Sequence, residues 1–404
     1  MRDPLPDERV DGRRAALTIA MVLAAVAVLA LSRPRLAGTI GVLLAIIGMI
    51  MLHELGHFVM AKRAGMKVTE FFLGFGPRLW SFRRGETEYG VKAIPAGGYV
   101  RIIGMSNIEE IDPADEERTY RAKPYRHRLG VAVAGSAMHF IIAAVLLFLV
   151  YAAAGLPSAQ PVVDHIEPGL PAATSDFRLG DRIVAINGEK VDEWEDVPRY
   201  VQSHGEDRLV FTVERDGDGR LDIALTPRIQ TVGDRQVPRV GVGPKIFLDR
   251  ESIPSAIGRT VGDMPRFTWM TIKALGGIFS PSGVENYTDL VMGREGDNSG
   301  RLLSPYGAAR VASDAVESGW AAVLMFLFAI NVFVGVFNMV PLLPLDGGHV
   351  AIATYEKIAS MVTRRRVQVD VAKLMPITAA VLLVLVVMGI SALYLDIVNP
   401  VDGP

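Results

Sequence analysis

Two histidines and a glutamate form the pattern His-Glu-x-x-His at His53, Glu54 and His57. In a helix with about 3.6 residues per turn, the two histidines lie on one face, about 40° apart. Two imidazoles at this spacing can bind one zinc ion, and Glu54 beside them can accept a proton from a water that the metal activates. The alternative is that both histidines are interior residues whose hydrogen bonds are satisfied within the protein. Three ionisable groups are costly in an apolar segment, however, so their presence there indicates a function. The pattern therefore predicts a zinc site with Glu54 as its catalytic base.

A catalytic zinc site needs a third protein ligand and one open coordination position. The chain has no cysteine, so this ligand must be a histidine or a carboxylate. Asp346 follows Pro341 and Pro344, which exclude a regular helix and free the backbone to turn the carboxylate toward the metal. Asp346 is therefore the expected third ligand, and His349 is the alternative.

Five uncharged stretches are long enough to concern a membrane, since a spanning helix needs roughly 20 apolar residues. Of the 404 residues, 50% are hydrophobic and 21% charged, and the mean hydropathy is +0.30. We therefore expect an α-helical polytopic membrane protein with about five transmembrane helices. The net charge of -2 gives no basic surface for nucleic acid. The stretches are Ala15–Leu31, Leu36–Leu52, Leu129–Ala154, Trp320–Val340 and Leu374–Leu395. The first could also be a signal peptide, although Ala25-Val26-Ala27 is a poor cleavage site.

The distribution of basic residues predicts the orientation of the chain in the cell membrane. Residues 61–128 contain 13 Lys and Arg, and residues 351–373 contain five. The positive-inside rule places both loops in the cytoplasm, and the long segment 155–319 outside. The zinc site is then expected toward the cytoplasmic side of a multi-pass protein.

Residues 66–103 contain several glycines and stretches in which apolar and polar residues alternate, as is typical of strands. Glu86–Lys92 and Gly98–Ile103 alternate, and Gly74 and Gly76 interrupt the segment before them. An apolar, glycine-broken β segment beside a span indicates a β-hairpin loop that dips into the membrane. A small cytoplasmic hairpin is the alternative.

Residues 161–228 have the pattern of a separate α+β domain, with strands, a short helix at Val197–Ser203 and a tight Asn187-Gly188 turn. The pattern resembles the PDZ domains of bacterial membrane proteases, which bind extended peptide ends by adding a strand to a sheet edge. A spacer with an unused groove is the alternative. After this domain, Pro254–Leu275 is expected to form an amphipathic helix, and Pro281–Gly300 a loop. The resemblance rests on Glu167-Pro168-Gly169-Leu170-Pro171-Ala172-Ala173, Leu179-Gly180-Asp181 and Ile186-Asn187-Gly188.

With both sets of site residues in view, nearly the whole chain after Leu36 resembles the site-2 proteases, a family of intramembrane zinc metalloproteases. Asn338, Pro341, Pro344, Asp346 and Gly347 match the family's second motif, with one extra leucine in the spacing. The resemblance implies that Asp346 binds zinc. It also implies single-span membrane substrates, such as anti-sigma factors, that an upstream site-1 protease has already shortened outside the membrane.

The resemblance also suggests which residues hold the substrate. The β-loop with Gly97 and Gly98 could capture an unwound substrate segment as an added strand, and Asn338 could help to hold it. The third span departs from the family pattern, because Ser136 and His139 stand where a proline and an asparagine are usual. His139 is therefore a candidate substrate contact that lacks the usual amide group.

Two other functions remain as alternatives to a protease. One is a zinc-binding scaffold or metal transporter, and the other is an inactive relative that binds substrates only through its PDZ domain. Clustering of the predicted ligands at one depth argues against a transport path, and the intact Glu54 argues against an inactive relative.

The sequence predicts five segments in order along the chain. They are an N-terminal tail with the extra helix (1–35), a first catalytic membrane part (36–155), the extracytoplasmic PDZ-like domain (158–250), an extracytoplasmic linker (251–319) and a second catalytic membrane part (320–404).

Overall fold

The chain divides into two compact units. A helical unit combines Met1–Val150 with Pro254–Pro404, and a β-rich unit is formed by Tyr151–Ile253. The structure is a computed structural model, and it describes residues 32–105, 109–232, 235–294, 296–297 and 301–400.

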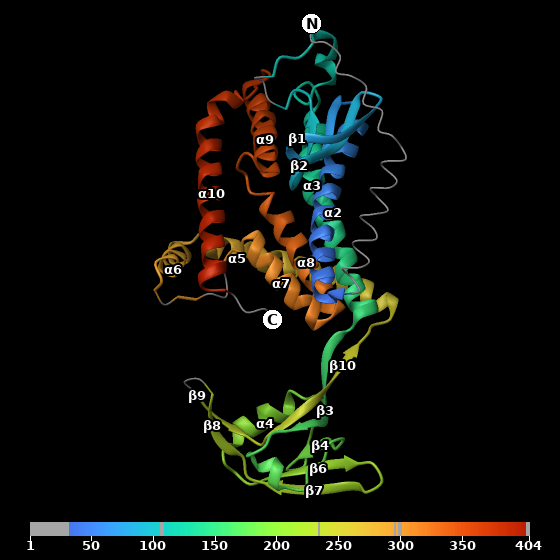
Figure 1. Cartoon of the computed structure of the whole chain (residues 1–404), viewed down its shortest axis with the longest axis vertical. Coiled ribbons are helices and arrows are strands. Elements are labelled where there is room, and N and C mark those ends of the chain that lie inside the picture. Colours follow the sequence, from blue (N-terminus) through green and yellow to red (C-terminus); the bar gives the residue numbers. More distant parts are fainter. Residues whose placement is uncertain (1–31, 106–108, 233–234, 295, 298–300, 401–404) are drawn as a thin grey trace. The chain divides into compact units, whose positions relative to one another are not determined.

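Four described helices of the helical unit are long and apolar enough to cross a membrane (Figure 1). These candidate spans are Arg35–Arg63, Tyr125–Ala154, Trp320–Phe337 and Val371–Val398, and they contain or overlap four of the five predicted apolar stretches. The fifth, Ala15–Leu31, lies outside the described residues. The helices of the unit are α2 (Pro34–Arg63), α3 (Tyr125–Leu149), α5 (Ile253–Ile278), α6 (Pro281–Val291), α7 (Pro305–Ser318), α8 (Trp320–Phe337), α9 (Asp346–Thr363) and α10 (Met375–Val398), with short 3-10 helices η1 (Pro113–Arg118) and η4 (Val371–Leu374).

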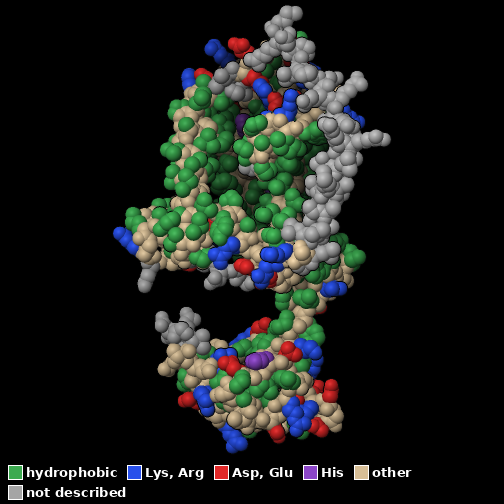
Figure 2. All heavy atoms as spheres, in the orientation of Figure 1, with side chains coloured by type: hydrophobic (Ala, Val, Ile, Leu, Met, Phe, Trp, Pro, Cys, Tyr) green, Lys and Arg blue, Asp and Glu red, His purple; other side chains and the backbone are tan. Residues whose placement is uncertain are grey.

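The surface of the helical unit supports the membrane assignment. Figure 2 shows hydrophobic side chains over most of its visible face, with charged side chains gathered toward its ends. Helix α10 adds to the apolar surface, since Leu383, Val387 and Ile390 are exposed. An apolar band between charged ends is what the hydrocarbon core of a bilayer requires. The predicted polytopic membrane protein is confirmed at this level.

The break between α8 and α9 follows the sequence prediction. Residues 338–345 form turns, and α9 begins at Asp346, with the Gly347 amide donating a 2.7 Å hydrogen bond to the Asn338 carbonyl. The connection is tight, because a Cβ on Gly347 would lie 2.3 Å from the Met339 carbonyl oxygen. The peptide bond between Leu343 and Pro344 is cis. The two prolines thus end one span and set the position at which the carboxylate of Asp346 begins the next helix.

A long antiparallel hairpin follows α2. Its strands are β1 (Val68–Arg84) and β2 (Thr87–Ile102). The pairing has several register shifts, and Gly74 and Gly76 adopt positive φ angles of 85° and 82°. Such conformations favour glycine and let the strands bend. The predicted β-hairpin is therefore present, whereas its depth in a membrane stays a prediction.

The β-rich unit is built on one antiparallel sheet with strand order β10-β3-β4-β6-β7 (Figure 1). Ile183, Ile186, Leu209, Phe211 and Val213 are fully buried at its centre. The strands and the helix predicted from the sequence are found, while the PDZ relationship remains a resemblance. The elements are η2 (Val150–Ala154, a π-helix), β3 (Leu156–Ile166), η3 (Pro171–Thr174), β4 (Arg182–Ile186), β5 (Glu189–Lys190), α4 (Asp196–His204), β6 (Leu209–Arg215), β7 (Gly219–Leu225), β8 (Arg228–Val232), β9 (Arg235–Arg239) and β10 (Val242–Asp249).

The segment before α8 contains more helix than the sequence predicted. Helix α5 confirms the amphipathic helix expected at Pro254–Leu275. The loop expected over Pro281–Gly300 is wrong for its first part, because α6 occupies Pro281–Val291. Ser280 caps this helix by accepting the Gly283 amide, and proline at the first helical position is a start signal.

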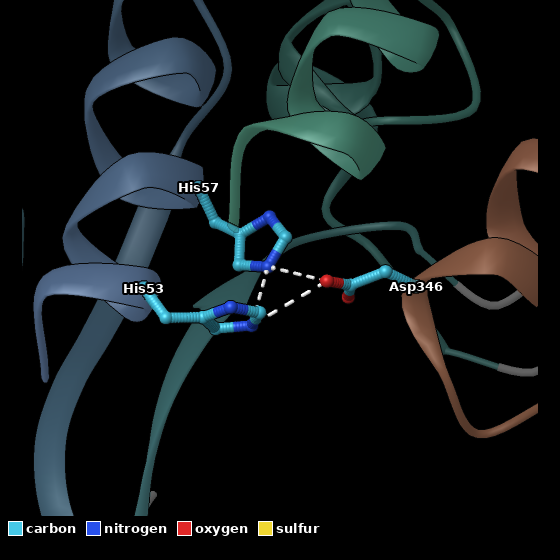
Figure 3. A group of neighbouring side chains, drawn as sticks. All are labelled: His53, His57 and Asp346. Atoms are coloured by element: carbon cyan, nitrogen blue, oxygen red, sulfur yellow. Dashed lines mark hydrogen bonds and ion pairs between the residues drawn. The ribbon is translucent and has the colours of Figure 1, made fainter. Parts of the chain in front are cut away.

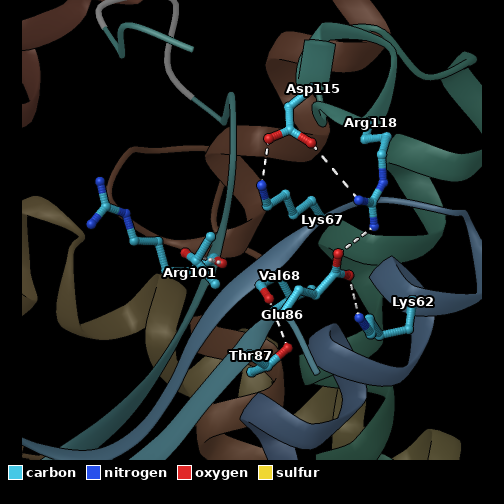
Figure 4. Close-up of polar contacts among 9 residues, drawn as sticks. Lys62, Lys67, Val68, Glu86, Thr87, Arg101, Asp115 and Arg118 are labelled. Carbon is cyan, nitrogen blue, oxygen red and sulfur yellow. Dashed lines mark hydrogen bonds and ion pairs between the residues drawn. The ribbon is translucent and has the colours of Figure 1, made fainter. Parts of the chain in front are cut away.

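Ion pairs connect the turn of the β-hairpin to the end of α2 (Figure 4). The carboxylate of Glu86, which lies in the β1–β2 turn, accepts hydrogen bonds from Lys62 on α2 at 2.5 Å and from Arg118 on η1 at 2.6 Å. Asp115 on η1 pairs with Lys67, at the start of β1. These contacts join the hairpin to the helix that carries His53 and His57, so we expect them to hold the hairpin beside the site.

We predict that Glu86→Gln accelerates amide exchange in the hairpin about threefold to tenfold, because partly exposed ion pairs contribute modestly. Burial raises the pKa of Glu86, but the hydrogen bonds from Lys62 and Arg118 outweigh it, so the pKa lies below its ordinary 4.5. A carboxyl with a depressed pKa stabilises the fold above its ordinary pKa, and this contribution is lost as the pH falls through the lower folded value.

Hydrogen exchange of the full chain in detergent measures this effect. The difference between parent and Glu86→Gln should persist at about pH 6 and shrink below pH 4.5. Glu88→Gln is the matched control. It makes the same substitution in the hairpin, but the partners of Glu88, Arg78 and Ser81, lie inside the hairpin and not on α2. Equal exchange in parent and Glu86→Gln at pH 6 contradicts the role of this connection.

Candidate metal centre

Three side chains from two helices converge on one point (Figure 3). The Nε2 atoms of His53 and His57 lie 3.2 Å apart. The Oδ2 atom of Asp346 lies 3.4 Å from His53 Nε2 and 3.2 Å from His57 Nε2. The structure thus brings the predicted third ligand, from the start of α9, to the two histidines of α2.

The spacing of these three atoms fits zinc. Bonds of about 2.0–2.1 Å in a tetrahedral arrangement separate ligand atoms by roughly 3.3 Å. Both histidines are buried, and Asp346 Oδ2 is a buried oxygen that accepts no hydrogen bond from the described part of the chain. A buried carboxylate oxygen without a donor and two nitrogens at contact distance are best satisfied by a shared cation.

A hydrogen bond orients the ring of His57. Its Nδ1 lies 2.7 Å from the carbonyl oxygen of Val131 on α3, so Nδ1 carries the proton and donates. The lone pair of the neutral ring is then on Nε2, which faces His53 and Asp346. Metal-ligating histidines commonly donate their other N–H in this way, and the bond sets the tautomer that a metal requires.

Glycines let α3 approach the two histidines. A Cβ on Gly135 would lie 2.4 Å from both His53 Cε1 and His57 Nε2. A Cβ on Gly56, within the His-Glu-x-x-His pattern, would lie 2.6 Å from the Ala134 carbonyl oxygen. Neither position has room for a side chain, so both glycines are needed for this packing. The metal centre is therefore built by α2, α3 and α9 together.

Glu54 lies between the two histidines in sequence and faces the hairpin. A Cβ on Gly98 of β2 would lie 3.2 Å from Glu54 Cγ, and the Val100 amide interacts with the carboxylate. The predicted residue Gly98 is thus next to the predicted base. Its neighbour Gly97 has a φ of 145° and packs against Phe75 instead. Strand β2 consequently passes beside the carboxylate of the predicted base.

His139 of α3 is buried beside the centre, with its ring 5.0 Å from that of His53. Its Nδ1 lies 2.8 Å from Asn331 Oδ1 on α8. Asn331 is fully buried, and its amide nitrogen donates to the Leu327 carbonyl at 2.7 Å. Asn331 was not among the residues predicted from the sequence, although an amide in an otherwise apolar span is a signal of function.

The remaining candidates lie farther from the chemistry. Asn338 ends α8, and its backbone carbonyl fixes the Gly347 amide next to Asp346, while no hydrogen bond of its side chain is found within the described chain. His349 packs edge-on against Tyr120, with ring centroids 6.3 Å apart, and does not belong to the metal group. Of the two possible third ligands, the structure places Asp346 at the centre.

Comparison with known proteins agrees with this geometry. Residues 41–385 match the family model described as Peptidase family M50. The chain is 35% identical to the zinc metalloprotease Rip1 of Mycobacterium tuberculosis over 398 residues, which covers 89% of this chain and 96% of that protein. It is 34% identical to Rip1 of Mycolicibacterium smegmatis, covering 89% and 97%. A putative zinc metalloprotease of Brucella suis is 30% identical, covering 81% and 88%.

The chain belongs to peptidase family M50, the site-2 protease family. It is a zinc metalloprotease with several apolar helices suited to a membrane. The resemblance drawn from the sequence motifs and the prediction of zinc are both confirmed.

We predict that Gly135→Ala weakens zinc binding about 10-fold to 100-fold, the range seen when the support of a metal ligand is altered. The added methyl group would have to displace both histidine rings. Gly130→Ala is the matched control on the same helix, because its Cβ would meet only the flexible end of Met60 at 3.2 Å. Competition with a chelator measures the affinity. Parental affinity in Gly135→Ala, or an equal loss in both variants, would disprove the packing argument.

Proposed function

We propose that this protein hydrolyses peptide bonds within or near the transmembrane segments of single-span membrane proteins, such as anti-sigma factors, in regulated intramembrane proteolysis. The observation that supports this most directly is the convergence of His53, His57 and Asp346, with Glu54 alongside, in helices suited to a membrane. A metal site placed among apolar helices serves a substrate that is itself in the membrane.

The proposed roles follow from the positions of the side chains. His53, His57 and Asp346 hold the zinc ion. When bound, zinc supplies a Lewis acid that lowers the pKa of a water molecule and polarises the scissile carbonyl group. Glu54 accepts the proton of the attacking water and then passes it to the leaving amine. Its backbone neighbours on β2 orient the carboxylate for both transfers.

The hairpin offers a place for the substrate chain. A helical substrate hides its peptide groups, so it must unwind before cleavage, and an extended segment can pair with a strand edge. Strand β2 at Gly97 and Gly98 passes beside Glu54, so a segment added there reaches the centre. We assign Asn338 and His139 as further contacts of the substrate chain. A cavity of about 380 Å³, lined by apolar residues that include Leu343 and Ile352, lies next to the turn before Asp346 and can accept substrate side chains.

The orientation and the role of the β-rich unit complete the proposal. We infer from the basic loops that the metal centre faces the cytoplasm and that residues 158–250 lie outside. As a PDZ-like domain, this unit screens substrates by their outer end or bulk, so that cleavage follows an upstream site-1 protease. The free edge strand β10 of its sheet is suited to an added peptide strand.

Replacement of Glu54 tests the general base. We predict that Glu54→Gln keeps parental zinc content but lowers cleavage about 100-fold to 10,000-fold, because the amide fills the same space and cannot accept the proton. Zinc is measured by mass spectrometry of the purified protein, and cleavage with a truncated single-span substrate in vesicles. Normal turnover by the variant would remove Glu54 from the mechanism.

A paired zinc assay tests the third ligand. Asp346→Ala is expected to lose both metal and activity, since two histidines alone make a weak site. His349→Ala should retain most of its zinc, because that ring packs on Tyr120 instead. If Asp346→Ala kept its zinc and His349→Ala lost it, the third ligand would be His349 instead of Asp346. The protein would still be a zinc metalloprotease.

Removal of the β-rich unit tests whether this unit screens substrates. Pro157 and Leu248 are paired across β3 and β10, so a short glycine turn can replace residues 158–247 with little strain. We expect this variant to cleave full-length substrate severalfold faster than the parent while still cleaving shortened substrate. If activity on the shortened substrate is lost as well and zinc is retained, the screening role is wrong.

A further inference from the structure

A basic pocket lies away from the metal centre, at the start of α3. Its volume is about 350 Å³, and it is enclosed by the loop before α3, one side of α9 and the segment that follows α9. Five cationic side chains line it, against a single carboxylate, that of Glu356. The cations are Arg121, Lys123, Arg128, Lys357 and Arg366.

The positive charge of this pocket is only partly neutralised. Arg128 pairs with Glu356, and Arg121 makes two hydrogen bonds, of 2.9 and 2.7 Å, to Glu116. Among the described residues, no carboxylate lies within ion-pair distance of Lys123 or Lys357. Several basic groups therefore face one cavity without enough acidic partners, which favours an anionic ligand.

The pocket lies where two candidate spans begin. Tyr125, one of its lining residues, is the first residue of the span Tyr125–Ala154. The span Val371–Val398 begins three residues after Gln368, another lining residue. The ends of spans lie at the level of the lipid headgroups, where phosphate groups are concentrated.

We propose that this pocket binds the phosphate group of an anionic phospholipid. Arg and Lys side chains are the usual partners of phosphate oxygens, and the N-terminus of α3, which no side chain caps, adds its positive dipole end. A soluble phosphate compound presents the same group. The position of the pocket at the ends of two spans favours the lipid.

The ligand would hold together two helices that build the metal centre. The Arg128–Glu356 pair joins α3 to α9, and the Arg366 side chain donates to the Arg121 carbonyl at 3.1 Å. Helix α3 carries Gly135 against the histidines, and α9 begins at Asp346. Lipid bound between these helices therefore stabilises the arrangement in which the three proposed ligands meet.

Native mass spectrometry of the full chain in neutral detergent tests the proposal without reference to protease activity. Phosphatidylglycerol is titrated into parent, Lys357→Gln/Arg366→Gln and the control Arg364→Gln/Arg365→Gln. The control removes the same charge from exposed neighbours that do not line the pocket. Inorganic phosphate at equal concentration forms a second arm.

We expect the parent and the control to bind one phosphatidylglycerol with similar affinity and the pocket variant to bind about 25-fold more weakly, about fivefold for each charge. Zinc content equal to that of the parent shows that the variant is folded, and Lys357→Gln alone should lose about fivefold. Equal binding by the pocket and control variants overturns the site. Displacement of the lipid by inorganic phosphate supports the pocket but overturns its assignment to a lipid.

Discussion

The close approach of α3 to α2 at Gly135 is the constraint on which the metal centre depends. Because this position has no side chain, the backbone of α3 lies directly against the rings of His53 and His57. The same approach brings the Val131 carbonyl to His57 Nδ1, which fixes the tautomer. Buried imidazoles and a buried carboxylate oxygen at these distances are costly without a cation, so the packing of three helices and the binding of zinc are coupled.

The elements around the centre supply its other parts. The proline-rich turn after α8 places Asp346 at the first position of α9, where a carboxylate is also favoured by the helix dipole. The hairpin brings Gly98 to Glu54 and is connected to the end of α2 through Glu86. The proposed metal ligands, base and substrate strand thus come from segments far apart in sequence, and each segment is attached to α2 or to α3.

Local patterns predicted a large part of this arrangement. The His-Glu-x-x-His spacing specifies one helix face, and the prolines before Asp346 specify a break, so the three residues that converge could be named without a structure. Contacts that depend on packing could not be predicted in this way. Nothing local marks the Val131 carbonyl as the partner of His57, and Asn331 meets His139 only because α8 packs on α3. Helix α6 was missed because its polar sequence outweighed the Ser280-Pro281 start signal.

X-ray absorption at the zinc edge of the purified protein tests the central claim most directly. For zinc held by His53, His57 and Asp346 we expect a first shell of nitrogen and oxygen at about 2.0–2.1 Å, with outer-shell scattering from two imidazoles and one carboxylate ligand. The alternative is a third imidazole, from His349 or from His139, whose ring lies 5.0 Å from that of His53. A spectrum with three imidazoles that is unchanged in Asp346→Ala would contradict the proposed centre.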